Sequence, residues 1–124
     1  MSRLVLYHNP GCSKSRGAVE ILQERGIDFE TIEYLSDPLE RPALEQILES
    51  LPDAPSELVR RDKNFKELGL DPEAYESSDA VVSLLLEHPK LMQRPIALLG
   101  ARGVIARPSE RVLELLDGLE PQNG

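Results

Sequence analysis

A short apolar run near the start of the chain constrains the fold more than any other feature. Leu4-Val5-Leu6-Tyr7 has the length of a strand, and the residues just behind it, Asn9-Pro10-Gly11, break regular structure. The run therefore predicts a buried strand that enters a tight loop. A helix is predicted beyond this loop, from Ser13 onward.

The next residues predict that helix and a second strand. Ala18, Ile21 and Leu22 recur at helical spacing, and Gly26 supplies a stop at the C-terminal end. Residues 27–34 are rich in β-branched and aromatic side chains, which favours a strand after a helical crossover. Strand, helix and strand together predict one βαβ unit.

The middle of the chain carries helical signals only. An amphipathic helix is predicted with Pro42 near its first turn. Shorter helical stretches are predicted at three further places, namely after Ser56, around Phe65, and from a cap at Ser78-Asp79. We predict a helical insertion over about residues 38–90.

The last third predicts a hairpin and a final helix. The apolar runs 96–99 and 104–106 flank a turn at residues 100–103, which is typical of an antiparallel hairpin. Pro108-Ser109 then opens a helix whose inward side chains are expected to be Val112, Leu113 and Leu116. The order βαβ, helical insertion, ββα is that of a thioredoxin-like α/β fold with a mixed four-stranded sheet.

Size, charge and cysteine content bound the remaining possibilities. The 124 residues suffice for one compact domain, expected over residues 1–117 with a flexible tail at 118–124. A net charge of −8 without a basic run opposes binding to nucleic acid or to an anionic membrane. No stretch approaches the roughly 18 apolar residues that span a bilayer. With one cysteine and no export signal, we expect a cytoplasmic protein.

Cys12, the single cysteine, falls between the buried strand and the first helix. Unpaired backbone N–H groups and the helix dipole stabilise negative charge there, so we expect a nucleophilic thiolate of low pKa. An imidazolium at His8 is expected to lower this pKa further. Ser13 and Ser15 offer hydroxyl donors, with Ser13 as an alternative helix cap. A free cysteine is more often a small apolar core residue, but the neighbours of Cys12 are small or polar.

One cysteine cannot close an internal disulfide. Redox enzymes of this layout often carry Cys-x-x-Cys, whose second thiol resolves a mixed disulfide, but position 15 is Ser. Turnover through a covalent sulfur intermediate therefore needs an outside thiol, and glutathione or a glutaredoxin is the expected supplier. We expect no metal, because one Cys and the distant His8 and His88 supply no ligand cluster.

The segment His8-Asn-Pro-Gly-Cys12-Ser-Lys-Ser15-Arg16 resembles the active-site loop of glutaredoxin-coupled arsenate reductases, and its Cys-Ser-Lys-Ser run is typical of a related branch. Three further motifs fall in the family's order and spacing along nearly the whole chain. They are Glu57-Leu-Val-Arg60, Gln93-Arg94-Pro95-Ile96 and Arg107-Pro-Ser-Glu110. The resemblance implies that Arg60, Arg94 and Arg107 bind an oxyanion near Cys12, and that Pro95 is a cis proline lining the active site.

The resemblance also implies a reaction. Cys12, with His8 and Ser15 in the catalytic set, would attack arsenate, and glutathione as co-substrate would complete the reduction to arsenite. A glutaredoxin would then release glutathione from the mixed disulfide with Cys12, and no bound cofactor is expected. Guanidinium groups suit this chemistry, because a thiolate and an oxyanion otherwise repel each other.

Other interpretations stay open from the sequence. A glutathione-dependent thiol–disulfide reductase or deglutathionylase would use Cys12 on disulfides and the arginines on glutathione carboxylates. A Spx-type regulator of the same fold, which binds RNA polymerase without catalysis, typically keeps Cys-x-x-Cys, so Ser15 counts against it. Arg60 beside Arg61 also fits a solvated helix face, and Arg107 fits an anchor for the last helix.

Overall fold

The computed structural model describes residues 3–116, with only the backbone of Leu116. The chain begins with β1 (Leu4–Tyr7), α1 (Ser13–Glu24) and β2 (Phe29–Ile32), and it ends with β3 (Ile96–Leu99), β4 (Arg102–Ile105) and the 3₁₀ helix η4 (Ser109–Leu116). The strands form one sheet in the order β2-β1-β3-β4. β1 pairs parallel with β2 and antiparallel with β3. The predicted thioredoxin-like fold with a mixed four-stranded sheet is confirmed.

A run of short helices connects β2 to β3. They are α2 (Arg41–Ser50), η1 (Pro55–Leu58), α3 (Lys63–Glu67), η2 (Pro72–Ala74), α4 (Ser78–Glu87) and η3 (Pro89–Leu91). Side-chain caps define three of the starts. The Asp62 carboxylate accepts from the Phe65 N–H, the Asp71 carboxylate from the Glu73 N–H, and the Ser77 hydroxyl from the Ala80 N–H. The cap of α4 is therefore Ser77, one residue before the predicted position.

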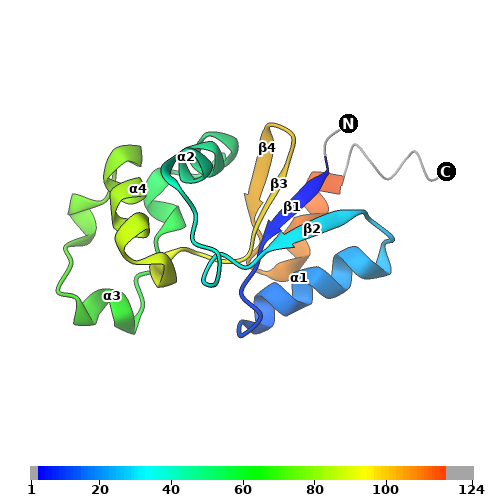
Figure 1. The fold of residues 1–124 in the computed structure, drawn as a ribbon, viewed down its shortest axis with the longest axis horizontal. Coiled ribbons are helices and arrows are strands. Elements are labelled where there is room, and N and C mark those ends of the chain that lie inside the picture. The colour runs from blue at the N-terminus through cyan, green and yellow to red at the C-terminus, as the bar shows by residue number, and fades with distance from the viewer. Residues whose placement is uncertain (1–2, 117–124) are drawn as a thin grey trace.

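Two apolar cores lie on opposite faces of the sheet. Leu4 and Leu6 join the core under α1 and η4, whereas Tyr7 joins the core of the insertion, because successive side chains of a strand point to opposite faces. Figure 1 shows α2, α3 and α4 gathered on one side of the sheet and α1 on the other. The insertion thus covers one face, and the buried strand predicted at the N-terminus is sandwiched between the two.

The bounds of two predicted strands differ from the structure, with β2 at 29–32 in place of 27–34 and β4 at 102–105 in place of 104–106. β2 ends at Ile32, because the chain turns where the Glu33 carbonyl accepts from the Ser36 N–H (2.9 Å). The β3–β4 turn is shorter than predicted, since Gly100 adopts φ +63° and Arg102 already pairs with Leu99. Both differences arise from backbone pairing, which residue type alone does not reveal.

The last helix is a 3₁₀ helix, in which Val112 and Leu115 are buried and Leu113 is partly buried. Three residues per turn put Leu115 below Val112, whereas the predicted α-helical spacing pointed to Leu116. The Leu116 side chain and the tail predicted at 118–124 lie outside the described residues. Within residues 3–116, no helix has the length and apolar character needed to cross a membrane.

Candidate functional site

Residues 9–12 form a tight loop held by its own backbone. The Cys12 N–H donates to the Asn9 carbonyl (2.9 Å), and the Gly11 N–H donates to Asn9 Oδ1 (2.9 Å). Cys12 is the N-cap of α1 with extended backbone angles, φ −102° and ψ 125°. The strand, loop and helix therefore present a partly buried thiol at the N-terminus of α1.

The Cys12 thiol has an unusually low pKa. Burial of the sulfur raises the pKa, but hydrogen bonds from the backbone N–H groups of Ser15 and Lys14, together with the charge and hydrogen bond of Arg94, outweigh burial. The pKa falls from 9.0 to about 7. A substantial fraction of Cys12 is therefore thiolate, the nucleophilic form, at neutral pH.

Neither serine hydroxyl makes a hydrogen bond to the Cys12 sulfur among the described residues. Ser15 is fully buried, and its Oγ accepts from the Asn9 N–H (3.3 Å), so this hydroxyl holds the loop while the Ser15 N–H reaches the sulfur. Ser13 is exposed and is the first residue of α1, so it is not the cap.

His8 lies at the end of β1 and is buried, with its Nδ1 atom lacking a hydrogen-bond partner among the described residues. Burial lowers its pKa, Glu33 raises it and Arg16 lowers it, with a lowered pKa as the result. The expectation that a His8 imidazolium lowers the Cys12 pKa is not met, because burial disfavours the charged ring. The groups that lower the thiol pKa are those named above.

Arg94 and Arg107 are tied together by backbone and side chain. The Arg94–Pro95 peptide bond is cis, as the family resemblance implied, and the Arg107–Pro108 bond is also cis, which no sequence signal predicted. Arg107 Nη1 donates to the Arg94 carbonyl (3.0 Å), and the Ala106 N–H donates to the Pro95 carbonyl (2.9 Å). Arg107 therefore supports the segment that carries Arg94 next to the thiol.

Arg60 lies beyond η1 and not on a helix, so the solvated-helix interpretation is wrong. Its N–H donates to the Leu91 carbonyl (2.7 Å), within an antiparallel bridge between Val59 and Met92. Its guanidinium pairs with the Asp62 carboxylate (3.1 Å), and its side chain is 22% exposed. Asp62, which also caps α3, is a supporting residue that the sequence analysis missed.

Arg94, Arg107 and Cys12 all lie close enough to Arg60 to influence its ionisation. Burial lowers the pKa of Arg60, and the charges of Arg94 and Arg107 lower it further, while Asp62 and the Cys12 thiolate raise it. Concentrated positive charge of this kind, around an ionised sulfur, suits the binding of a small anion.

Tyr34 is a second residue that the sequence analysis missed, because an aromatic residue at a predicted strand end is not a specific signal. Its side chain is 1% exposed, and its hydroxyl makes no hydrogen bond of good geometry with the described residues. Burial raises its pKa to about 12, with Arg94 and Arg60 lowering the value and Cys12 raising it. A neutral hydroxyl therefore lies within electrostatic reach of the cluster.

A pocket of about 210 Å³ opens beside these residues. Its polar lining consists of Asn9, Tyr34, Arg60, Asn64, Lys90 and Arg94. A larger cavity of about 370 Å³ lies between α3 and α4, but neither Arg60 nor Arg94 lines it, whereas both line the smaller pocket. The positions of the two arginines therefore favour the smaller pocket as the binding site.

Within residues 3–116, no group of His, Cys, Asp or Glu is arranged to hold a metal ion.

The chain is similar to known proteins both in sequence and in structure. A model of the ArsC family matches residues 7–115. An arsenate reductase from Neisseria meningitidis serogroup A is 37% identical over 118 residues, which cover 94% of this chain and 100% of the relative. An arsenate reductase from Escherichia coli strain K12 is 35% identical over 119 residues, covering 94% and 82% respectively. A solved arsenate reductase from Vibrio cholerae superposes with a TM-score of 0.82 at 36% identity, covering 93% of this chain and 98% of that one.

Proposed function

Because the chain belongs to the ArsC family, we propose that it reduces arsenate to arsenite, with Cys12 as the nucleophile and with glutathione and a glutaredoxin as reductants. The observation that carries the proposal is a low-pKa thiol at the start of α1 that shares its surroundings with Arg94, Arg60 and Arg107. An anionic nucleophile attacking an anionic substrate needs fixed positive charge at the substrate oxygens. The three guanidinium groups supply it.

The proposed reaction begins at the Cys12 sulfur. The thiolate attacks arsenic, an arsenic–sulfur bond forms, and a hydroxyl group of arsenate takes up a proton and leaves as water. A glutathione thiolate then bonds to the Cys12 sulfur while the electron pair of the arsenic–sulfur bond stays on arsenic. Arsenic gains two electrons, and the two sulfurs lose them by forming a mixed disulfide.

The cysteine content of the chain supports the proposed use of an outside thiol. Cys12 is the only cysteine of the chain, and Ser15, in the position of a resolving cysteine, is buried with its hydroxyl engaged by the loop. The Cys12–glutathione disulfide must therefore be opened by another protein or by free thiol. A glutaredoxin, which exchanges such disulfides, completes the cycle.

The proposal is tested by measuring arsenite formation from arsenate with glutathione and a glutaredoxin. We expect turnover with the native chain, none with Cys12→Ser, and native rates with Arg61→Gln, which removes an exposed charge next to Arg60. Omitting the glutaredoxin should leave a glutathione adduct on Cys12, visible by mass spectrometry. A native chain that reduces glutathionylated substrates but not arsenate would contradict the proposal and favour a thiol–disulfide reductase.

A further inference from the structure

The pocket beside the arginine cluster has features that arsenate alone does not explain. The pocket of about 210 Å³ is lined by Arg60 and Arg94 but not by Cys12, so it extends away from the sulfur at which arsenate would react. Lys90 and Asn64 line the pocket on the side of α3 and η3. Both side chains are exposed. They add a cation and an amide that reach outward from the cluster.

We propose that this pocket binds the carboxylate end of the peptide thiol that reduces the enzyme, with Lys90 and the Tyr34 hydroxyl as contacts for its charged and polar groups. This inference rests on the proposed function in one respect, namely that a glutathione-like thiol meets Cys12. It adds the place where that thiol is recognised.

The charges of the pocket favour a ligand that carries carboxylates. Arg60, Lys90 and Arg94 are its charged lining residues, and no acidic residue is among the described residues that line it. Asp62 compensates only Arg60, through the ion pair at 3.1 Å. In a chain with a net charge of −8, this is a local concentration of positive charge.

The neutral groups of the pocket are available as donors. The Tyr34 hydroxyl is buried next to Arg94 but makes no hydrogen bond of good geometry with a described residue, which is costly unless a ligand or water satisfies it. Asn9, which also lines the pocket, uses its Oδ1 to accept from the Gly11 N–H, and its Nδ2 amide is a donor that makes no hydrogen bond with a described residue. A peptide backbone with carboxylates can accept from both.

Arg94 connects the pocket to the reacting sulfur. Its guanidinium lines the pocket and hydrogen-bonds to Cys12. A glutathionyl group attached to Cys12 can therefore extend past Arg94 toward Tyr34 and Lys90. The same pocket would hold the group while the mixed disulfide waits for the next thiol.

Disulfide exchange tests the inference without arsenate. In this reaction the Cys12 thiolate attacks glutathione disulfide, the Cys12–glutathione S–S bond forms, the old S–S bond breaks, and one glutathione thiolate leaves. The neutral probe is bis(2-hydroxyethyl) disulfide, which lacks carboxylates. We expect Lys90→Gln to slow exchange with glutathione disulfide about fivefold, the upper range for an exposed charge pair, and to leave the neutral probe unchanged.

The matched control is Lys66→Gln, which removes the same charge from an exposed position of α3 outside the pocket. Equal slowing by Lys66→Gln would show general electrostatic attraction, and slowing of both disulfides by Lys90→Gln would show an effect on the thiol. Either result would overturn the inference. Mass spectrometry of the adduct against time gives the rates.

Tyr34→Phe provides a second measurement, with Tyr75→Phe as its control, since Tyr75 is partly buried against Phe65 and lies outside the pocket. We expect Tyr34→Phe alone to slow exchange with glutathione disulfide about threefold. An unchanged rate would remove Tyr34 from the ligand contacts. If these patterns hold while arsenate is not reduced, the proposed function is wrong and the pocket assignment stands.

Discussion

The two faces of the sheet contribute different halves of the candidate site. On the α1 face, Cys12 is served by backbone N–H groups that follow it directly in sequence. On the insertion face, Arg60 and Arg94 come from distant segments that the bridge between Val59 and Met92 brings together. The thiolate is thus a local product of strand, loop and helix, whereas the positive charge depends on tertiary structure.

Arg107 joins the two halves. It precedes η4, whose Ser109 hydroxyl donates to the Lys14 carbonyl in the first turn of α1 (2.7 Å). The contact is close, because a Cβ added at Gly17 would lie 2.7 Å from Ser109 Oγ. The position of Arg107 is therefore set by α1, while its guanidinium supports the Arg94 backbone.

The largest effect on stability is expected from substitutions in the two cores, which we expect to unfold together because they share one sheet. Leu22 in the α1 core and Ile47 in the insertion core are both fully buried. We expect Leu22→Ala and Ile47→Ala each to lower the free energy of unfolding by about 2–5 kcal/mol, with a single transition in urea. Near-ultraviolet and far-ultraviolet circular dichroism measure it. Two separate transitions would contradict a sheet shared by both cores.

Removing the link between thiol and positive charge should give the next largest effect. We expect Arg94→Gln to raise the pKa of Cys12 above about 7 and to lower arsenate turnover about 100-fold, the usual loss for one donor to a developing charge. Iodoacetamide labelling against pH gives the pKa, and initial rates give turnover. Arg61→Gln is the control, and a Cys12 pKa that is the same in both variants would show that the backbone alone sets the thiolate.

The local half of the site predicts a pH dependence of stability. The folded-state pKa of Cys12 is lowered from 9.0 to about 7, so ionisation of the thiol stabilises the folded chain. This contribution to the free energy of unfolding is complete above pH 9 and is lost as the pH falls through 7. Relative to Cys12→Ser, the native chain should gain about 1 kcal/mol in free energy of unfolding between pH 7 and 9. Urea titrations at the two pH values measure it. A constant difference would contradict the lowered pKa.

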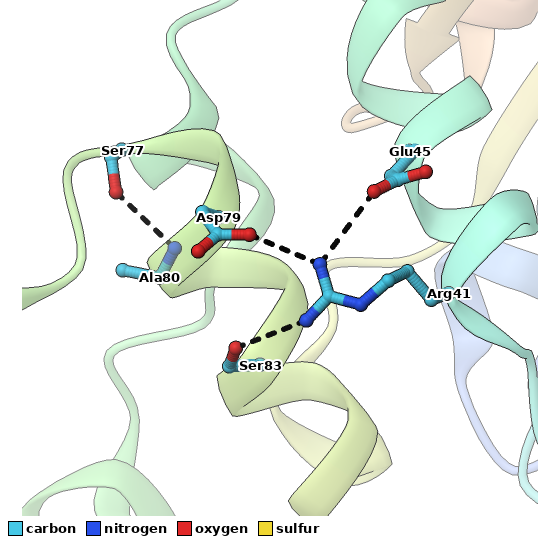
Figure 2. A network of polar contacts seen from close by, with 6 residues as sticks. All are labelled: Arg41, Glu45, Ser77, Asp79, Ala80 and Ser83. Carbon is cyan, nitrogen blue, oxygen red and sulfur yellow. Dashed lines mark hydrogen bonds and ion pairs between the residues drawn. The ribbon is translucent and has the colours of Figure 1, made fainter.

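The smallest effect is expected on the surface of the insertion. Arg41 contacts Asp79 (3.1 Å), Ser83 (3.3 Å) and Glu45 (3.6 Å), linking α2 to α4 as Figure 2 shows. These groups are solvent-exposed, so Arg41→Ala should cost about 0.5 kcal/mol and leave turnover unchanged. Thermal unfolding and initial rates test this. A loss of turnover would mean that α2 and α4 control the arginines more tightly than the contacts indicate.

The site was predictable from sequence where its causes are local. The Cys12 loop follows from an apolar strand, three breaking residues and a helix start, all within a few positions. The arginine positions came from a resemblance to a family, because nothing in the residues around Arg60 shows that it faces a cysteine far away in sequence.

Tyr34 and Asp62 illustrate what local patterns leave out. Tyr34 has the residue type of a strand, but its burial in the insertion core depends on helices that come later in the chain. Asp62 is a normal helix cap by sequence position, and its second role appears only when Arg60 folds back to within 3.1 Å. The 3₁₀ helix η4 likewise packs against α1 and the sheet, and these contacts with distant segments are not visible in its apolar spacing.

The bridge between residues 58–60 and 91–93 has a consequence for how the chain tolerates change. The bridge joins the two ends of the segment 61–90. Its hydrogen bonds, each of 2.7 Å, run from the Arg60 N–H to the Leu91 carbonyl and from the Gln93 N–H to the Leu58 carbonyl. Lengthening a closed loop costs little additional entropy. Insertions and deletions in the turns between α3 and α4 can therefore accumulate during evolution without altering the spacing of Arg60 and Arg94. The segment 61–90 is thus a place where related proteins can diverge in length.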